Sequence, residues 1–187
     1  MSTIHIKNMV CDRCIMVVNK QLRLLGFNLD FVELGKVGFH EKITPEQKDL
    51  IKKTLEPLGF ELIDDKRIRI VEQIKNNIIR LVHQTNTQLN INLSDYLVEK
   101  IHHDYSYISH LFSEIENTTI EKYYIAQKIE RAKELLVYDE LTLNEIADLL
   151  NYSSTAHLSA QFKKVTGLTP SHFKKIKENK RKPLDEI

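Results

Sequence analysis

Two cysteines, the only ones in this chain of 187 residues, stand three positions apart in the run Met9-Val10-Cys11-Asp12-Arg13-Cys14. Thiolates at this spacing can converge on one soft metal ion such as Cu(I), or they can be oxidised to a disulfide. A purely structural disulfide would stabilise little, because it closes a very small loop. We expect Cys14 in the first turn of a helix, where backbone amides and the helix dipole favour a thiolate. Metal binding, redox sensing and a domain that only contacts a partner are the three interpretations.

A second group of residues with a chemistry of its own is the set of basic side chains near the C-terminal end. Between positions 163 and 182 the basic residues, opposed by Glu178 alone, are Lys163, Lys164, Lys174, Lys175, Lys177, Lys180, Arg181 and Lys182. This concentration predicts a polyanionic partner, although the formal net charge of +1 is not that of a strongly basic DNA binder. A solvated basic tail is the alternative.

The cysteines must be positioned by short alternating elements within residues 1–64. The hydrophobic pattern predicts strands at 3–7, 28–33, 36–40 and 60–63 and helices at 14–25 and 45–58. Thr44, Pro45 and Gln47 form a capping signal at the start of the second helix. The resulting order, βαββαβ, is typical of a ferredoxin-like sheet with two helices on one face.

The remainder of the chain has helical periodicity and contains a weak internal repeat with an offset of 50 residues. Residues 108–112 match residues 158–162, and Asn117 matches Gly167. Asn and Gly are the residues best suited to the left-handed conformation that ends a helix. Each copy therefore predicts a supporting helix, a turn, and a second helix that begins after a capping residue, Asp104 or Ser154.

A helix over residues 121–137 should connect the two copies and should be about 25 Å long. A rigid connector of this length would hold two recognition helices about one turn of DNA apart, so that one chain contacts two successive major grooves. A helical bundle without a role in DNA binding is the alternative.

The second copy carries a distinctive motif: LNEIA at 143–147, YSS at 152–154 and HLSAQFKKVTGLTP at 157–170. This motif closely resembles the signature of AraC/XylS transcription regulators. The connecting helix is also similar, with Lys128 where that family usually has arginine. The resemblance covers about residues 70–178 and implies a seven-helix DNA-binding domain with two helix-turn-helix units that acts on a promoter.

The residues expected to face DNA lie on the exposed side of the two second helices, opposite the buried positions 108, 112, 158 and 162. They are Ser106, Ser109, His110, Ser154, Thr155, Ala156, Ser159 and Ala160. In the AraC/XylS family such positions make base contacts. Alanine cannot form a bidentate hydrogen bond with a base, so much of the affinity should come from phosphates. The expected phosphate ligands are Lys163, Lys164, Lys174, Lys175, Ser154 and Ser171.

The cysteine motif, placed between the first strand and the first helix, resembles the heavy-metal-associated domain of copper chaperones and metal-pumping ATPases. The resemblance spans residues 3–63 and implies that Cys11 and Cys14 ligate the metal while Met9 packs inward. Asn8 stands where that family usually has glycine. Two cysteines leave a zinc ion two ligands short of a closed site.

These patterns together predict an α+β chain. We expect a ferredoxin-like input domain at 1–64, a joining helix and loop at 65–92 that includes the first helix of the DNA-binding domain, a double helix-turn-helix domain at 93–178, and a tail at 179–187. The N-terminus lacks the features of a secretory signal, and no apolar run reaches the roughly 20 residues of a membrane helix. A cytoplasmic, bacterial protein is therefore expected.

The predicted function is a DNA-binding transcription regulator, with a response to a soft ion such as Cu(I) at Cys11 and Cys14 as a hypothesis. The ion would change the packing of the input domain on the helix at 67–84 and thereby alter DNA binding. Double-stranded promoter DNA is the expected partner; RNA polymerase and a second copy of the chain are candidate partners, and a membrane is not. A metal-trafficking or thiol-redox protein with a helical interaction module is the alternative. No arrangement of nucleophile and base is visible, so we do not expect an enzyme.

Overall fold

A computed structural model of the protein describes residues 2–84 and 91–176. The expected loop at 84–88 lies largely outside these residues, and the tail at 179–187 lies wholly outside them. The chain divides into two compact units, Met1–Asn76 and Asn77–Ile187, here called the N-terminal and C-terminal units. The division falls within helix α3 (Lys66–His83), so this one helix contributes residues to both units.

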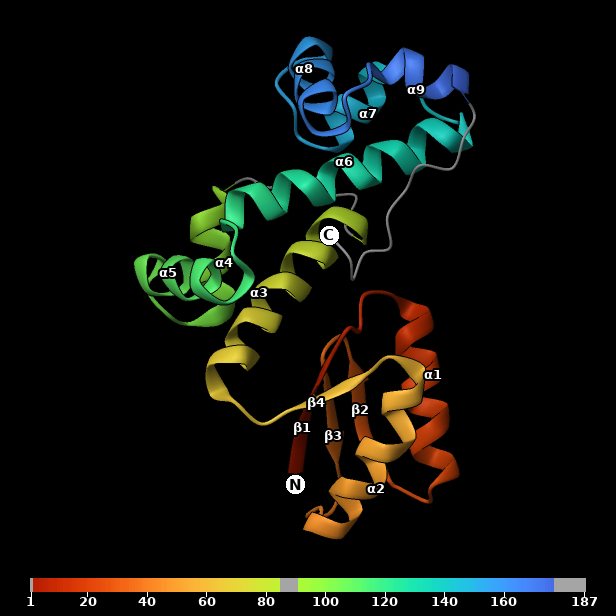
Figure 1. The fold of residues 1–187 in the computed structure, drawn as a ribbon, viewed down its shortest axis with the longest axis vertical. Coiled ribbons are helices and arrows are strands. Elements are labelled where there is room, and N and C mark those ends of the chain that lie inside the picture. The colour runs from red at the N-terminus through yellow and green to blue at the C-terminus, as the bar shows by residue number, and fades with distance from the viewer. Residues whose placement is uncertain (1, 85–90, 177–187) are drawn as a thin grey trace. The chain divides into compact units, whose positions relative to one another are not determined.

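The N-terminal unit is built on a small antiparallel sheet with the strand order β2-β3-β1-β4. Figure 1 shows α1 and α2 covering one face of this sheet. Its elements are β1 (Ser2–Lys7), α1 (Asp12–Leu24), β2 (Leu29–Glu33), β3 (Lys36–Phe39), α2 (Pro45–Leu55), a 3₁₀ turn (Glu56–Leu58) and β4 (Glu61–Ile63). The strands and helices predicted from the sequence are present, with ends that differ by a few residues.

The core of the N-terminal unit lies between the sheet and the two helices. Ile4 and Ile6, two positions apart in β1, both point into it, as the alternation of apolar residues predicted. Leu22 of α1 and Ile51 of α2 meet them from the helical side. At the start of α2, the Thr44 hydroxyl accepts a hydrogen bond from the backbone N–H of Gln47, and the Gln47 side-chain oxygen accepts one from the backbone N–H of Thr44, so the predicted capping box is confirmed.

The described part of the C-terminal unit consists of helices. After α3 come α4 (Leu93–Ile101), α5 (Tyr105–Glu116), α6 (Ile120–Tyr138), α7 (Leu143–Leu149), α8 (Thr155–Thr166) and α9 (Pro170–Ile176). Helices α4 and α5 form the first helix pair, and α7 and α8 form the second. Figure 1 shows the first pair near the beginning of α6, and α7, α8 and α9 along the remainder of that helix.

Helix α6 forms the centre of this unit because its side chains are buried on most of its circumference. Ile129 and Ala132 are fully buried, and the small alanine allows neighbouring helices to approach closely. The ring of Tyr123 contacts Phe112 of α5 with their centroids 5.6 Å apart, which fixes the first pair on α6. Within the described ranges, none of the helices has the length and apolar character needed to cross a bilayer.

The ends of α5 and α8 show why the sequence repeat produces two similar helices. Asn117 has φ 54° and Gly167 has φ 78°, so both residues take the left-handed conformation predicted for them. The chain is thereby turned out of each helix at matching positions. The protein thus combines a small N-terminal antiparallel sheet with a helical C-terminal half.

Candidate nucleic-acid interface

Helix α8 is held by one buried side and by a well-formed N-terminus. Leu158 and Phe162 are fully buried, as the helical spacing predicted. The Ser154 hydroxyl accepts a hydrogen bond from the backbone N–H of His157 at 3.1 Å, which is the predicted cap. The opposite side of α8 is therefore presented to solvent in a fixed orientation.

The predicted DNA-facing residues of the second pair lie on this accessible side of α8. Ala156 and Ala160 are exposed, whereas Thr155 and Ser159 are half-buried and therefore less accessible. Lys163 and Lys164 are exposed one to two turns further along the helix. The arrangement places small side chains where they can approach base edges and ammonium groups where they can reach a phosphate backbone.

Helix α5 presents a related surface with a different N-terminus. Ser106 and His110 are exposed and Ser109 is half-buried. Asp104 occupies the predicted capping position, but its side chain makes no capping hydrogen bond. A hydrogen bond between the Tyr105 hydroxyl and the Glu121 carboxylate links the start of α5 to α6, and this bond together with burial raises the pKa of Tyr105.

Three side chains on these helices were missed by the sequence reasoning. His157 is exposed in the first turn of α8 and its Nδ1 lies 3.1 Å from the Ser153 hydroxyl. Gln161 is half-buried one turn later, and Tyr107 of α5 is 46% exposed. An imidazole or an amide can read a base edge through hydrogen bonds. The signal that could have found them is position, because each follows directly after a predicted residue on the exposed side.

Lys128 joins α6 to the turn between the two helices of the second pair. Its Nζ lies 3.4 Å from the Asn151 carbonyl oxygen and 3.8 Å from the ring centroid of Tyr152. The ring of Tyr124 lies on the same ammonium at 5.2 Å. Burial lowers the pKa of Lys128 to about 8, because the charged form is poorly solvated there. This buried contact fixes the turn from which α8 begins.

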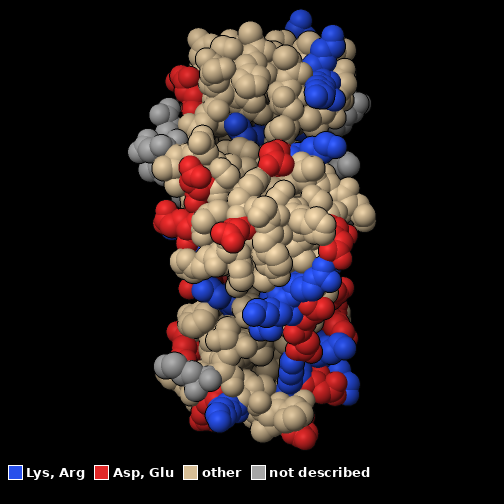
Figure 2. Space-filling view, turned by 90° about the vertical axis from the view of Figure 1, so that its left-hand side faces the viewer, with Lys and Arg blue, Asp and Glu red and all other residues tan. Residues whose placement is uncertain are grey.

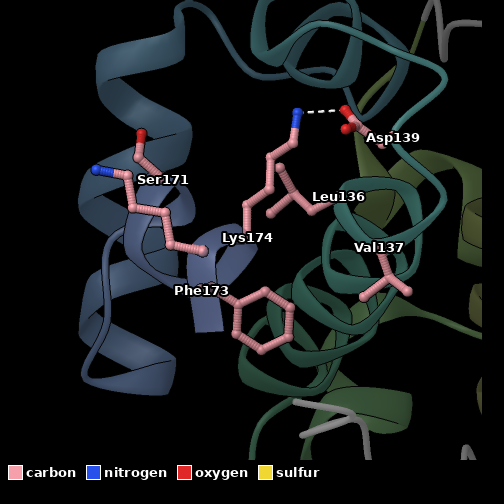
Figure 3. Close-up of a pocket in the computed structure, with 7 residues that line it drawn as sticks. Leu136, Val137, Asp139, Ser171, Phe173 and Lys174 are labelled. Carbon is pink, nitrogen blue, oxygen red and sulfur yellow. Dashed lines mark ion pairs between the residues drawn. The ribbon is translucent and has the colours of Figure 1, made fainter. Parts of the chain in front are cut away.

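The two lysines of α9 stand in a different environment from those of α8. Lys174 forms an ion pair with Asp139 at the end of α6, and Figure 3 shows this pair at the rim of a pocket. The pocket, about 740 Å³ in volume, is lined by Leu136, Val137, Asp139, Ser171, Phe173, Lys174 and Lys175. The partner of Lys174 in the structure is thus a carboxylate, which weakens its case as a phosphate ligand.

The cysteine pair lies at the junction of the loop after β1 with α1. The two Sγ atoms are 3.5 Å apart and both cysteines are free. Within residues 2–84 and 91–176, no cluster of three or more histidine, cysteine or carboxylate side chains is arranged to hold a metal ion. Two convergent sulfurs without a third such ligand fit a soft ion of low coordination number better than zinc.

The environment of Cys14 differs from the expectation. Cys14 does lie in the first turn of α1, but burial raises the pKa of its thiol, an effect that outweighs the hydrogen bonds from the backbone. The predicted thiolate is therefore not favoured in the structure. Met9 is 1% exposed and packs into the core.

Asn8 explains how the loop tolerates a residue other than glycine. It has φ 69°, a left-handed conformation that asparagine adopts more readily than most residues. Its side-chain amide donates a hydrogen bond to the Gly59 carbonyl oxygen at 2.9 Å. The loop that carries the cysteines is therefore tied to the chain segment that precedes β4.

Comparison with known proteins identifies a helix-turn-helix domain in the helical part. Residues 97–176 match the family described as a helix-turn-helix domain. In structure, the chain is similar to the C-terminal domain of AraT, a response regulator from Geobacillus stearothermophilus, with a TM-score of 0.51 and 22% identity over 60% of this chain and 88% of that one. The C-terminal half thus contains a helix-turn-helix domain, with a fold similar to that of the AraT domain.

Two curated relatives are similar in sequence over the same region. The uncharacterized HTH-type transcriptional regulator YtdP of Bacillus subtilis (strain 168) is 24% identical over 109 residues, which is 58% of this chain and 14% of that protein. The Msm operon regulatory protein of Streptococcus mutans serotype c is 27% identical over 105 residues, 56% of this chain and 37% of that protein. Both are named as regulators, which agrees with the expectation that the helical domain is not an enzyme. The chain spans well under half the length of either relative.

Proposed function

We propose that this chain is a sequence-specific, DNA-binding transcription regulator of the AraC type, in which α8 enters the major groove and α5 is the second candidate recognition helix. The observation that carries the proposal is the second helix pair, whose outer helix has one fully buried side, a capped N-terminus and an exposed face of small residues next to two lysines. A recognition helix needs these properties, because its backbone must approach base edges closely while nearby ammonium groups neutralise phosphates.

Five of the predicted residues on α8 have side chains whose chemistry supports a role in binding DNA. Ala156 and Ala160 can contact thymine methyl groups, and Ser159 can exchange hydrogen bonds with any base. Lys163 and Lys164 would neutralise phosphates. Since alanine and serine do not form bidentate pairs with guanine or adenine and the two lysines are assigned to phosphates, the affinity should depend strongly on salt.

Salt-dependent binding to a labelled 30-base-pair duplex of random sequence tests the proposal. We compare the full-length wild type with Lys163→Ala/Lys164→Ala, and we use Lys52→Ala/Lys53→Ala as a matched control, since these adjacent lysines are exposed on α2. Loss of two phosphate contacts should make the slope of log K against log salt shallower by about 1.8. A slope equal to that of the control would contradict the proposal.

We further propose that the N-terminal unit is a ferredoxin-like domain that responds to a soft metal ion. The strand order β2-β3-β1-β4 and the 3.5 Å separation of the two Sγ atoms support this. Cys11 and Cys14 would hold the ion, and such an ion, once bound, would fix the loop that Asn8 ties to Gly59. The change would reach the C-terminal unit through α3, which is shared by both units.

Titration with Cu(I) and the same titration of Cys11→Ser/Cys14→Ser test the metal site. A thiolate-to-copper absorption band with one ion per chain should appear in the wild type and be absent from the variant. DNA binding measured on the same samples then tests control by the metal, because identical binding curves with and without Cu(I) would eliminate it.

The partners and location follow from this function. A protein that binds promoter DNA would act in the cytoplasm. RNA polymerase and a second copy of the chain are candidate partners there. The competing function is a metal-trafficking or thiol-redox protein with a helical interaction module. It would be favoured if the wild type bound Cu(I) but showed no salt-dependent affinity for DNA.

A further inference from the structure

The two helix pairs have the same internal packing and different electrostatic surfaces. At the repeat offset of 50 residues, the fully buried Ile108 and Phe112 match the fully buried Leu158 and Phe162. The matched segments nevertheless differ in charge: residues 91–119 contain five acidic residues and one lysine, whereas residues 141–169 contain two acidic residues and two lysines. The similarity of the two pairs is therefore confined to their cores.

The differences fall on positions where a recognition helix meets phosphates. Where the second pair presents Lys163 and Lys164, the first presents Ser113 and Glu114. Lys164 is exposed, and the Glu114 side chain is 49% exposed, with its nearest carboxylate oxygen 4.0 Å from Nδ1 of His110. A carboxylate therefore stands next to one of the predicted base-reading residues of α5.

The residues at the N-termini of α5 and α8 also differ in charge, and again the acidic residue belongs to the first pair. Ser154, a neutral residue, caps α8, and its hydroxyl is used by the backbone of that helix. The matched residue of α5 is Asp104, an exposed carboxylate whose side chain does not cap the helix. The N-terminus of a helix attracts phosphate through its amide groups and dipole, and a carboxylate placed there opposes that attraction.

Figure 2 shows the consequence at the surface. Acidic side chains lie among uncharged ones at the level of α4 and α5, while basic side chains lie toward one side of the top, at the level of α8, where an acidic group is also visible on the other side. Resting on the proposed DNA-binding function, we infer that the two helix pairs act unequally: the second pair anchors the duplex through phosphates, and Asp104 and Glu114 hold the first pair back from the DNA backbone.

Charge exchange between matched positions tests this inference. Glu114→Lys gives the first pair the residue of the second, and Lys164→Glu does the reverse. Glu41→Lys and Lys42→Glu, at exposed positions of the N-terminal unit, are the matched controls for total charge. The probe is the labelled 30-base-pair duplex of random sequence, titrated with full-length protein between 50 and 200 mM KCl.

We expect Glu114→Lys to bind more tightly than Glu41→Lys and to gain one phosphate contact. One added contact steepens the salt slope by about 0.9, which is an additional loss of affinity of about 3.5-fold between 50 and 200 mM KCl. Lys164→Glu should weaken binding and make the slope shallower by a similar amount. If Glu114→Lys behaved as Glu41→Lys does, the inference would be overturned.

Amide hydrogen exchange on the same complexes gives a readout that does not depend on affinity. DNA should protect residues 154–166 of the wild type and leave residues 104–116 nearly unprotected, and Asp104→Ser/Glu114→Lys should extend protection to the latter segment. Equal protection of both segments in the wild type would overturn the inference alone. Absence of binding by the wild type at 50 mM KCl would overturn the proposed function and the inference with it.

Discussion

The buried ammonium of Lys128 should make the stability of the protein depend on pH in a way that can be calculated. Lys128 is 7% exposed, and burial lowers its pKa from 10.5 to about 8. Between these two values the folded state binds fewer protons than the unfolded state. The cost of burying the charge is therefore fully present below pH 8 and is relieved as the pH rises toward 10.5.

The magnitude follows from the two pKa values. Each unit of pKa difference corresponds to about 1.4 kcal/mol, so the cost at pH 7 is about 3 kcal/mol. At pH 9.5 more than half of this cost has been relieved, and about 1 kcal/mol remains. Relative to Lys128→Met, which has no group to titrate, the free energy of unfolding of the wild type should rise by about 2 kcal/mol from pH 7 to pH 9.5.

Urea unfolding of the full-length proteins, followed by far-UV circular dichroism at several pH values, measures this difference. The titration of other groups contributes to both proteins and largely cancels in the comparison. Lys122→Met is the matched control, because Lys122 lies on the same helix and is exposed. A difference between wild type and Lys128→Met that stays flat with pH would refute the reasoning. It would mean that the rings of Tyr124 and Tyr152 keep the ammonium charged despite its burial.

Three further predictions about the local structure can be tested by thermal unfolding. Ser154→Ala should cost about 1 kcal/mol by removing the cap of α8, whereas Asp104→Ala should cost less, because its side chain makes no capping bond; equal losses would contradict this. At φ 54°, Asn117→Ala should cost about 1 kcal/mol and Asn117→Gly should cost nothing, and the reverse order would show that the conformation is not left-handed. Gly38→Ala should cost about 1–3 kcal/mol, because its new Cβ would lie 2.4 Å from the Phe31 ring, and Phe31→Leu in the same chain should recover part of the loss.

The helices and their ends could be predicted from the sequence because the signals that set them are local. The capping box at Thr44 and Gln47 is complete within four residues, and Ser154 and Gly167 mark the two ends of α8. Burial of one side of each helix follows from apolar spacing alone. The same spacing predicts the exposed sides of α5 and α8, because the residues of each helix that do not face the core must face solvent.

The environment of individual polar groups could not be predicted in this way, because it depends on segments far apart in the chain. Lys128 meets Asn151 and Tyr152 only after α6 packs against the turn of the second pair. Cys14 was expected to be a thiolate on the strength of its helical position, but the packing of α1 on the sheet buries its thiol and raises its pKa. Local signals describe the backbone of these sites and not their solvation.

The internal repeat shows the same division between packing and surface chemistry. Matching the two copies by their apolar residues leads correctly to two similar helix pairs, because packing against α6 imposes the same requirement on both. It does not follow that both copies act on the same ligand, since the positions that decide this lie on the outside, where packing imposes nothing. At those positions Glu114 of the first copy corresponds to Lys164 of the second, and Asp104 corresponds to Ser154. A repeat in the core is thus evidence for shared architecture. The surface charges of the two pairs differ, so the repeat alone does not predict an equal role in DNA binding, and the inferred inequality is tested by the charge exchanges at Glu114 and Lys164.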